Sequence, residues 1–341
     1  MTSVNTSCEV VNTSCDVVNT SCPTHTTGWE STINQLYTYV YLIIFIPGLL
    51  CNTLALWVLC RFISKKTKAI IFMINLTVAD LAHVLSLPLR IHYYITQDWP
   101  FGSGLCMLCF YLKYLNMHAS IVFLVCISIQ RCAFLLQPFR AKHWKSRYDN
   151  CISAAVWLVV GLCCSPFILM RSKSNSGNNS TTCFKDLPMR KLDVPSAVSM
   201  MVAAELLGFL GPLIIIGFCT YLIVQSLRRR NQKQQSTGST RKALRMVRVC
   251  TGVFLFCFAP YHINFLLYLM VTQCIITNCA ASQAIRLFHP ISLCIASLNC
   301  CLNPLIYYFL TTEFKQQLSQ HGSSVLRGRL MSTESISSYR D

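Results

Sequence analysis

Residues 75–82 form the stretch NLTVADLA, which places the carboxylate of Asp80 inside an apolar segment. Residues 125–136, VCISIQRCAFLL, place Arg131 inside another apolar segment. A charged side chain at membrane depth is costly, and it is retained mainly where it faces the interior of a helix bundle and has a role there. The two stretches therefore predict a helical membrane protein with an internal switch.

The composition supports this interpretation. Of the 341 residues, 53% are hydrophobic and only 12% are charged, whereas a soluble domain carries about 25% charged residues. The mean hydropathy is +0.48. The 21 cysteines would suggest a disulfide scaffold, but most of them lie in apolar runs or at their ends, where a thiol behaves as a small hydrophobe.

Seven apolar segments are long enough to cross a bilayer of about 30 Å. The predicted fold class is an all-α membrane protein, a seven-transmembrane-helix bundle over residues 36–310. Its expected spans are 36–61, 69–95, 104–136, 150–170, 196–227, 243–271 and 284–310. We expect three flanking segments: an extracellular glycosylated tail over 1–35, a short amphipathic cytoplasmic helix over 311–320, and a serine-rich cytoplasmic tail over 321–341.

Basic residues are distributed unequally along the chain. No lysine or arginine precedes Arg61, whereas the loops after the first, third and fifth spans are basic. The positive-inside rule then predicts an extracellular N-terminus, and we expect the plasma membrane. The net charge of +17 is explained by this topology and by attraction to anionic lipid of the inner leaflet, so no nucleic-acid partner is expected. Five glycosylation sequons fall on the outer side: Asn5, Asn12, Asn19, Asn178 and Asn179.

Landmark residues recur in order through the spans. They are Asn52, LTVAD ending at Asp80, WPFG at 99–102, Trp157, Pro212, FLFCFAPYH at 254–262 and NPLIY at 303–307. With them the chain resembles the rhodopsin-like (class A) G-protein-coupled receptors over about residues 36–320. The stretches IFMINLTVADLAHVLSLPLRI, LCFYLKYLNM and FAPYHINF are similar to the purinoceptor-like branch and, within it, to the lysophosphatidylserine receptors.

Two disulfides follow from the outer cysteines and the resemblance. Cys106 opens the third span and Cys183 lies in the next extracellular loop, so a bridge would tie the loop to the helix tip in an oxidising compartment. The resemblance implies the same pair. It also implies a bridge from the N-terminal tail to Cys279. Cys22 is our choice of partner, with Cys8 and Cys15 as competitors, since connectivity does not follow from sequence.

The resemblance implies that Asp80, Ser120, Asn299 and Asn303 meet at mid-membrane. Oxygen ligands of this kind suit a hard cation, and in the family this is a sodium site that collapses on activation. A water-filled polar cluster is the alternative. No other cofactor is expected.

The family's Asp-Arg-Tyr triplet is Gln130-Arg131-Cys132 in this chain. Phe258 stands where many relatives carry tryptophan, and we expect it to pack against Phe254 below Pro260, whose missing amide donor permits a kink. The implied activation switch comprises Arg131, Phe258, Pro260, Asn303, Pro304 and Tyr307.

Positive charge gathers at the outer mouth of the predicted bundle. Lys113 stands where amine receptors carry an acid, and arginine suits bidentate recognition of phosphate or carboxylate, so an anionic ligand is predicted. The candidate ligand-binding residues are Arg90, Tyr94, Lys113, Tyr114, His118, Arg171, Glu205, Tyr261, His262 and Arg286.

Alternatives stay open for five of these side chains. Arg171 and Arg286 could extend to the lipid headgroups, Lys113 could face a neighbouring helix, and His118 could be structural. Glu205 could neutralise a resident base or meet a ligand ammonium.

These observations predict a receptor for an anionic lysophospholipid, in particular lysophosphatidylserine. It would signal through heterotrimeric G proteins, with the twelve/thirteen class implied by the resemblance. Arrestin, receptor kinases and membrane lipid are the other expected partners. The alternative is a nucleotide or peptide receptor of the same branch, and a transporter or channel is a more remote one. No constellation typical of an enzyme is present, so no catalytic activity is expected.

Overall fold

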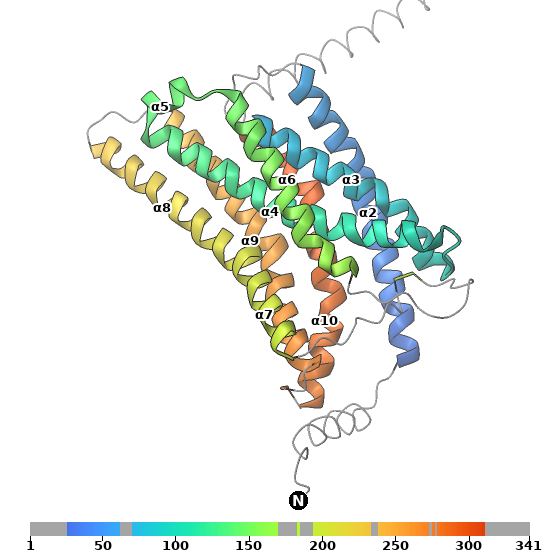
Figure 1. The fold of residues 1–341 in the computed structure, drawn as a ribbon. Coiled ribbons are helices and arrows are strands. Elements are labelled where there is room, and N and C mark those ends of the chain that lie inside the picture. Colours follow the sequence, from blue (N-terminus) through green and yellow to red (C-terminus); the bar gives the residue numbers. More distant parts are fainter. Residues whose placement is uncertain are drawn as a thin grey trace, which may run out of the picture.

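The computed structural model describes residues 26–61, 70–169, 183–184, 194–232, 238–272, 275–276 and 278–310. All regular structure within these ranges is helical, as the sequence predicts (Figure 1). The elements are α2 (Thr26–Arg61), α3 (Ile70–Thr96), α4 (Gly102–Leu136), α5 (Pro138–His143), α6 (Ser146–Leu169), α7 (Val194–Glu205), the π-helical turn η1 (Leu206–Leu210), α8 (Gly211–Gln232), α9 (Gly238–Thr272), α10 (Cys279–Ser297) and α11 (Asn299–Leu310).

Seven helices in the described ranges are long and apolar enough to cross a membrane, which confirms the predicted seven-helix bundle. The fifth span is built from α7, η1 and α8, and the seventh from α10 and α11. The predicted amphipathic helix over 311–320, the C-terminal tail and residues 1–25 of the predicted N-terminal tail lie outside the described residues, whereas residues 26–35 of that tail belong to α2.

Six of the seven spans begin as helices before their predicted apolar segments do, and α2 and α10 are two examples. Helix α2 starts at Thr26 rather than residue 36, and α10 starts at Cys279 rather than residue 284. Hydropathy measures the length that lies in hydrocarbon, whereas a helix continues for as long as its backbone bonds are satisfied. At α10 the side chain of Asn278 accepts a hydrogen bond from the backbone N–H of Ala281 at 3.1 Å, which caps the helix.

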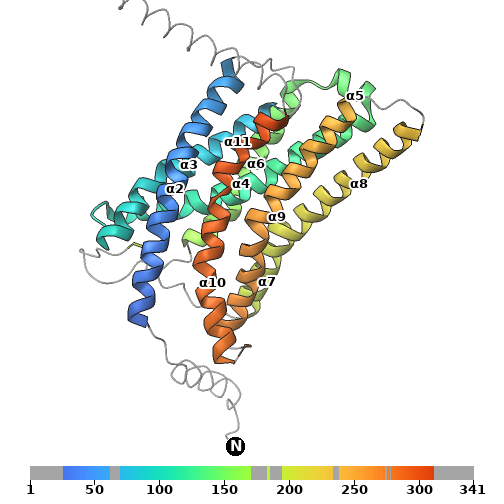
Figure 2. The same ribbon diagram turned by 180° about the vertical axis from the view of Figure 1, so that it is seen from behind.

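Helix α4 lies at the centre of the bundle, where it contacts α3, α6, α8 and α9. Both views show it running obliquely across the other helices (Figures 1 and 2). Helix α2 packs against α3 and α11, and α9 packs against α8, α10 and α11. The side chains of α4 therefore reach most of the other spans.

The outward-facing side chains are apolar. Leu207 is 74% exposed and Ile214 is 69% exposed, and many other large hydrophobic residues share this outer surface. A water-soluble protein rarely exposes an apolar surface of this extent, but the hydrocarbon of a bilayer accepts it without cost. The polar side chains instead lie inside the bundle, among them Asn52, Asp80 and Asn303.

A proline in the seventh span is compensated by a side chain from the first. Pro304 has no N–H, so the carbonyl of Cys300, four residues before it, lacks its usual helical donor. Asn52 Nδ2 donates to this carbonyl at 2.7 Å and to the Gly48 carbonyl at 2.8 Å. Gly48 also allows α2 to lie close to α3, because a Cβ at this position would lie 3.0 Å from Val84 Cγ2. Asn52 thus joins α2 to α11.

Asn52→Ala should destabilise the fold, because it leaves the Cys300 carbonyl without a donor inside the bundle. We expect a loss of about 1–3 kcal/mol, measured as a lower thermal unfolding midpoint of the purified protein in detergent. Cys51→Ala is the matched control, since Cys51 is exposed on the same helix. Equal midpoints for the two variants would show that the bridge contributes little.

Candidate functional site

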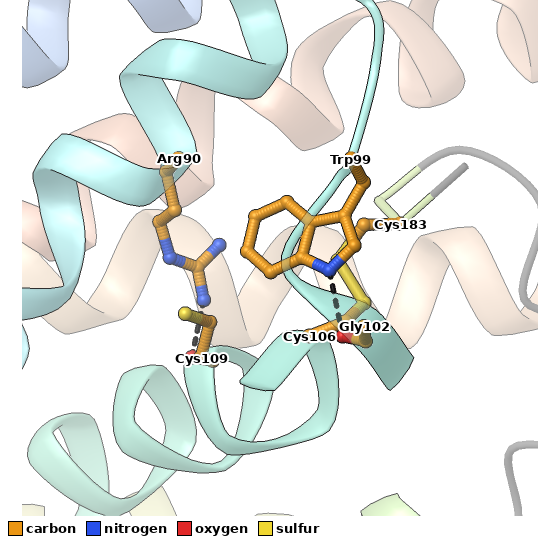
Figure 3. The surroundings of a disulfide bond; sticks show 6 residues. All are labelled: Arg90, Trp99, Gly102, Cys106, Cys109 and Cys183. Carbon is orange, nitrogen blue, oxygen red and sulfur yellow. Dashed lines mark hydrogen bonds between the residues drawn. A yellow bond between two sulfur atoms is a disulfide. The ribbon is translucent and has the colours of Figure 1, made fainter. Parts of the chain in front are cut away.

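The loop that precedes α4 is held by a disulfide and a turn. Cys106 and Cys183 are bonded, with Cα atoms 5.8 Å apart, as the family resemblance implies. Figure 3 shows Trp99 beside this bridge, with its Nε1 donating to the Gly102 carbonyl at 2.8 Å. Gly102 adopts a φ of +77°, a conformation that favours glycine. We call this end of the bundle the disulfide end and the opposite one the Arg131 end.

Arg90 is deeply buried near the disulfide, at 1% exposure. Its Nη2 donates to the Cys109 carbonyl, as Figure 3 shows, and its guanidinium lies 4.7 Å from the ring centroid of Phe184 and 5.8 Å from that of Phe110. Its Nε is buried without a hydrogen-bond partner, and none of the described carboxylates forms an ion pair with it. A buried cation without a counterion is costly, so the site is suited to receive an anion.

A second cation near Arg90, the ammonium of Lys113, is surrounded by tyrosine rings. Lys113 Nζ donates to the Tyr41 hydroxyl at 3.3 Å and lies 5.8 Å from the Tyr37 ring. Tyr94 stacks on Tyr37, with ring centroids 4.6 Å apart. Together these residues form what we call the cation box: Arg90, Lys113, Tyr37, Tyr41, Tyr94 and Phe184.

The cation box contains three residues that sequence reasoning missed. Tyr37 and Tyr41 come from the first span. They are four residues apart, so both rings lie on one face of the helix. Phe184 directly follows the bridged Cys183, a position that signals proximity to α4. These aromatic faces stabilise the two cations.

Glu205 and His262 form a buried pair deeper in the bundle. His262 Nδ1 lies 3.2 Å from each carboxylate oxygen of Glu205. This contact joins α7 to α9 and supports the interpretation of Glu205 as a partner for a resident base. His118 lies close by, with its ring 6.5 Å from that of His262, and its Nδ1 contacts the Tyr114 carbonyl at 2.9 Å.

An aromatic stack continues from this pair toward the Arg131 end. The ring of His262 stacks on Phe209 at 4.9 Å, Phe209 stacks on Phe254 at 5.6 Å, and Phe254 meets Phe258 edge-on at 5.8 Å. The predicted packing of Phe258 against Phe254 is therefore confirmed. Phe209 lies in the π-helical turn η1, a type of irregularity found frequently at functional sites.

Asp80 is fully buried at the centre of a polar cluster. Asn116 Nδ2 and Asn303 Nδ2 each donate to one of its carboxylate oxygens at 2.9 Å, and the Ser120 hydroxyl lies at 3.5 Å. Asn299 Nδ2 donates to Asn116 Oδ1 at 3.4 Å. The four predicted residues thus come together. Asn116 was missed, although it lies one helical turn before Ser120.

The cluster retains unused oxygen atoms. Within the described residues, Asn299 Oδ1 and Asn303 Oδ1 are buried without a hydrogen-bond partner. Neutral amide oxygens beside a carboxylate form the donor set that a hard cation prefers. The residues present therefore fit the sodium ion that the family resemblance implies.

A small cavity separates the cation box from the polar cluster. It is lined in part by Lys113, Asn116, Ser297 and His83, and its volume of about 10 Å³ is near that needed for one water molecule. His83 is buried, and neither of its ring nitrogens has a partner in the described part of the chain.

At the Arg131 end, the altered triplet makes its own contacts. Gln130 Nε2 donates to Asp149 at 2.7 Å, and Trp144 Nε1 donates to the same oxygen at 2.8 Å. Cys132 packs in an apolar cluster with Cys219 and Val247. Asp149 is thus engaged by two neutral donors.

The remaining predicted site residues either lie outside the cation box or lie outside the described ranges. Tyr114 is half-buried on α4, Tyr261 is buried beside His262, and Arg286 is exposed on α10. Cys279 is disulfide-bonded, but its partner lies outside the described residues, so Cys22 remains a prediction. The same holds for Arg171, for the side chain of Tyr307 and for the five sequons.

Comparisons with known proteins agree with this architecture. Residues 51–307 match the family model described as 7 transmembrane receptor (rhodopsin family). The chain is 59% identical over 304 residues to the protein of Homo sapiens named "Putative P-two-Y purinoceptor 10", and the match covers 89% of each chain. It is 50% identical over 285 residues to "Probable G-protein coupled receptor 174" of Homo sapiens, covering 84% of this chain and 86% of that one. It is 33% identical over 300 residues to "Lysophosphatidic acid receptor 6" of Homo sapiens, covering 87% of each.

Asn116→Leu should destabilise the fold, because it removes one of the two close donors to Asp80. We expect a loss of about 1–3 kcal/mol in the unfolding free energy, seen as a lower thermal midpoint without ligand. Ser120→Ala is the matched control, because its 3.5 Å contact is at the limit of a hydrogen bond. An equal or larger effect of the control would contradict this ranking of the donors.

Proposed function

The chain belongs to the rhodopsin family of G-protein-coupled receptors, and from this premise we propose that its ligand is an anionic lysophospholipid, in particular lysophosphatidylserine. It is a multi-pass membrane receptor that acts with heterotrimeric G proteins, and not an enzyme. The observation that carries the ligand proposal is Arg90, a buried guanidinium with an unused Nε and no carboxylate partner among the described residues.

The cation box provides chemistry for a phosphorylated headgroup. Arg90 would bind the phosphate with its planar fork, and Lys113 would add a second positive charge. Tyr94 and Tyr114 would donate hydroxyl hydrogen bonds, and Arg171 is proposed for the same group. The acyl chain would occupy the apolar gap between the middle helices.

The alternative ligand is a nucleotide, which also carries phosphate. One relative is named a purinoceptor and another a lysophosphatidic acid receptor, so the names of relatives point both ways. The sixth span favours the lipid over a nucleotide, which would need a cation for a second phosphate. One turn beyond Pro260 the chain has Asn264 rather than a basic residue. Asn264 is buried and contacts His289 Nδ1 at 3.2 Å, so this position supplies an amide and not a cation for a second phosphate.

In the proposed mechanism, the aromatic stack of His262, Phe209, Phe254 and Phe258 transmits ligand binding from the disulfide end to the Arg131 end. An anion bound at Arg90 and Lys113 would favour one packing of the aromatic stack that starts at His262. That packing would bias α9 to move outward near Phe258 and to open a crevice lined by Arg131. G proteins of the twelve/thirteen class are the proposed transducers.

The remaining partners follow from the sequence. We place the receptor in the plasma membrane with an extracellular, glycosylated N-terminus, and we propose that kinases and arrestin act on the serine-rich tail. We also propose that sodium binds at Asp80. The unpartnered amide oxygens of Asn299 and Asn303 support this ion.

A ligand panel on cells that express the chain tests the proposed ligand. Lysophosphatidylserine should activate a RhoA-type reporter at lower concentrations than lysophosphatidic acid or nucleotides, whereas untransfected cells should not respond. Activation by a nucleotide alone would select the alternative.

Arg90→Lys should weaken lysophosphatidylserine activation at least tenfold, because lysine keeps the charge but loses the bidentate fork, at a cost of about 1.5–3 kcal/mol. The measurement is a concentration–response curve at matched surface expression. Arg61→Lys is the control, because Arg61 is exposed at the far end of α2. Unchanged potency of the Arg90 variant would exclude this anchor.

Sodium should lower agonist affinity by about 5-fold or more relative to a bulky cation such as choline at equal ionic strength. Asp80→Asn should abolish this difference, because the substitution removes the only charged group of the cluster. Competition binding on membranes in the two salts measures the effect. A variant that keeps the full sodium effect would show that the ion binds elsewhere.

A further inference from the structure

Two cysteines of different helices are in contact at the Arg131 end of the bundle. Cys132 of α4 is 4% exposed and Cys219 of α8 is 6% exposed, and both are free thiols. The two thiols share a hydrogen bond and pack in one apolar cluster. Cys300 and Cys301 are also in contact, but they are adjacent residues of one helix. We call Cys132 and Cys219 the thiol pair.

The thiol pair lies where α4, α8 and α9 meet. Leu244 and Val247 of α9 pack in the same buried cluster. Cys132 directly follows Arg131, and α4 ends one turn later at Leu136. Both views show α8 ending at the same end of the bundle as α5, the short helix that follows α4 (Figures 1 and 2). A bond between the two sulfurs would therefore fix α8 to α4 beside Arg131.

The geometry and the compartment of the thiol pair both favour a reversible bond. A disulfide forms only between cysteines whose Cβ vectors point toward each other, and thiols that share a hydrogen bond across two helices meet this condition. The basic loops predict that the Arg131 end faces the cytoplasm. Thiols are kept reduced there, and the disulfides that do form are usually transient and redox-sensing. The bridge between Cys106 and Cys183, at the opposite end, faces the oxidising side instead.

We propose that the thiol pair is a redox switch, in which hydrogen peroxide forms a Cys132–Cys219 disulfide and a cytosolic dithiol reduces it again. Peroxide transfers one oxygen to one of the sulfurs as its O–O bond breaks, which gives a sulfenic acid and one water. The other thiol attacks that sulfur, so that the S–S bond forms and a second water leaves with the thiol proton. The pair loses two electrons in total. The dithiol returns them by exchange and becomes a disulfide itself.

The thiol pair is placed where this oxidant can reach it. Each side chain keeps a small exposed fraction, and Cys132 lies one turn from the end of its span. Hydrogen peroxide is small and uncharged, so it can enter from the cytoplasmic side. Cys250 of α9 is fully buried and belongs to the main core cluster, which makes it a control for cysteines that are merely buried.

The disulfide restrains α8 relative to α4. A bond of about 2.05 Å is much shorter than the contact between two thiols, so the cluster under Leu244 and Val247 tightens around it. The bond itself is independent of the proposed ligand. Its effect on signalling rests on the proposed mechanism, in which the helices around Arg131 separate to admit a G protein, and the restraint should oppose that separation.

Mapping of linked cysteines in the full-length receptor tests the bond. Cells that express the chain are exposed to hydrogen peroxide, and free thiols are then blocked with N-ethylmaleimide under denaturing conditions. The receptor is purified, digested without reduction and examined by mass spectrometry. A peptide pair joined through Cys132 and Cys219 should appear with peroxide and disappear when the cells recover without it.

Two variants separate this bond from general thiol oxidation. Cys219→Ala should lower the linked species by about tenfold or more, because a disulfide needs both sulfurs. Cys250→Ala, at a buried position on α9, should leave it unchanged. In the purified receptor, peroxide should raise the thermal midpoint of the wild type and of Cys250→Ala, because a cross-link constrains the unfolded chain. It should not raise that of Cys219→Ala.

The remaining measurement is nucleotide exchange by a heterotrimeric G protein with lysophosphatidylserine as the probe. Peroxide should lower exchange by the wild type and not by Cys219→Ala.

Three outcomes would overturn the switch. Recovery of Cys132 and Cys219 as blocked thiols after peroxide would show that they do not react, and equal midpoints with and without the link would show that it restrains nothing. Unchanged exchange by the linked receptor would remove its role in signalling. A receptor that ignores lysophosphatidylserine would contradict the proposed ligand instead, and the linked peptide and the midpoint would still decide the thiol pair.

Discussion

The carboxylate of Asp80 imposes the strongest constraint on this bundle. It is fully buried, and in hydrocarbon no bulk water compensates a polar group, so neighbouring helices must supply its donors. Asn116 of α4 and Asn303 of α11 do so at 2.9 Å each, which requires α3, α4 and α11 to meet at one depth. Asn303 directly precedes Pro304, and Asn52 satisfies the carbonyl that this proline leaves without a helical donor. The first, second, third and seventh spans are thus joined by amides rather than by apolar packing alone.

Arg90 contrasts with Asp80 in how its charge is satisfied. Two amides and a hydroxyl surround the carboxylate, whereas the guanidinium has one backbone carbonyl and two aromatic faces. Aromatic faces offset only part of the cost of burying a cation. Glu205 does not close the gap, because it pairs with His262. The described bundle therefore satisfies Asp80 at mid-depth and leaves the charge of Arg90 without a counterion at the disulfide end, which is the electrostatic arrangement expected of an anion receptor.

The sequence was sufficient for the seven spans, because apolar length is a local property that hydropathy measures directly. It was also sufficient for the residues around Asp80 that the resemblance supplied. It was insufficient for the beginning of α10, where the signal is the capping side chain of Asn278 rather than hydropathy. It likewise missed Asn116, Tyr37, Tyr41 and Phe184 and left the partner of Glu205 open. These contacts join different helices, and they depend on how each helix is rotated about its axis, which spacing along one span does not determine.

Two irregular helical segments, the π-helical turn η1 and the turn at Pro260, lie beside the aromatic stack between the disulfide end and the Arg131 end. The π-helical turn η1 follows Glu205 directly and places Phe209 between His262 and Phe254. Pro260 lies between Phe258 and His262, so the residues at both ends of the stack flank a break in the α9 hydrogen bonds. At the Arg131 end the residue before the arginine is a neutral glutamine, and the nearby acid Asp149 is bonded to it. The aromatic stack resists rearrangement, because rotating Phe258 requires Phe254, Phe209 and the ring of His262 to repack with it.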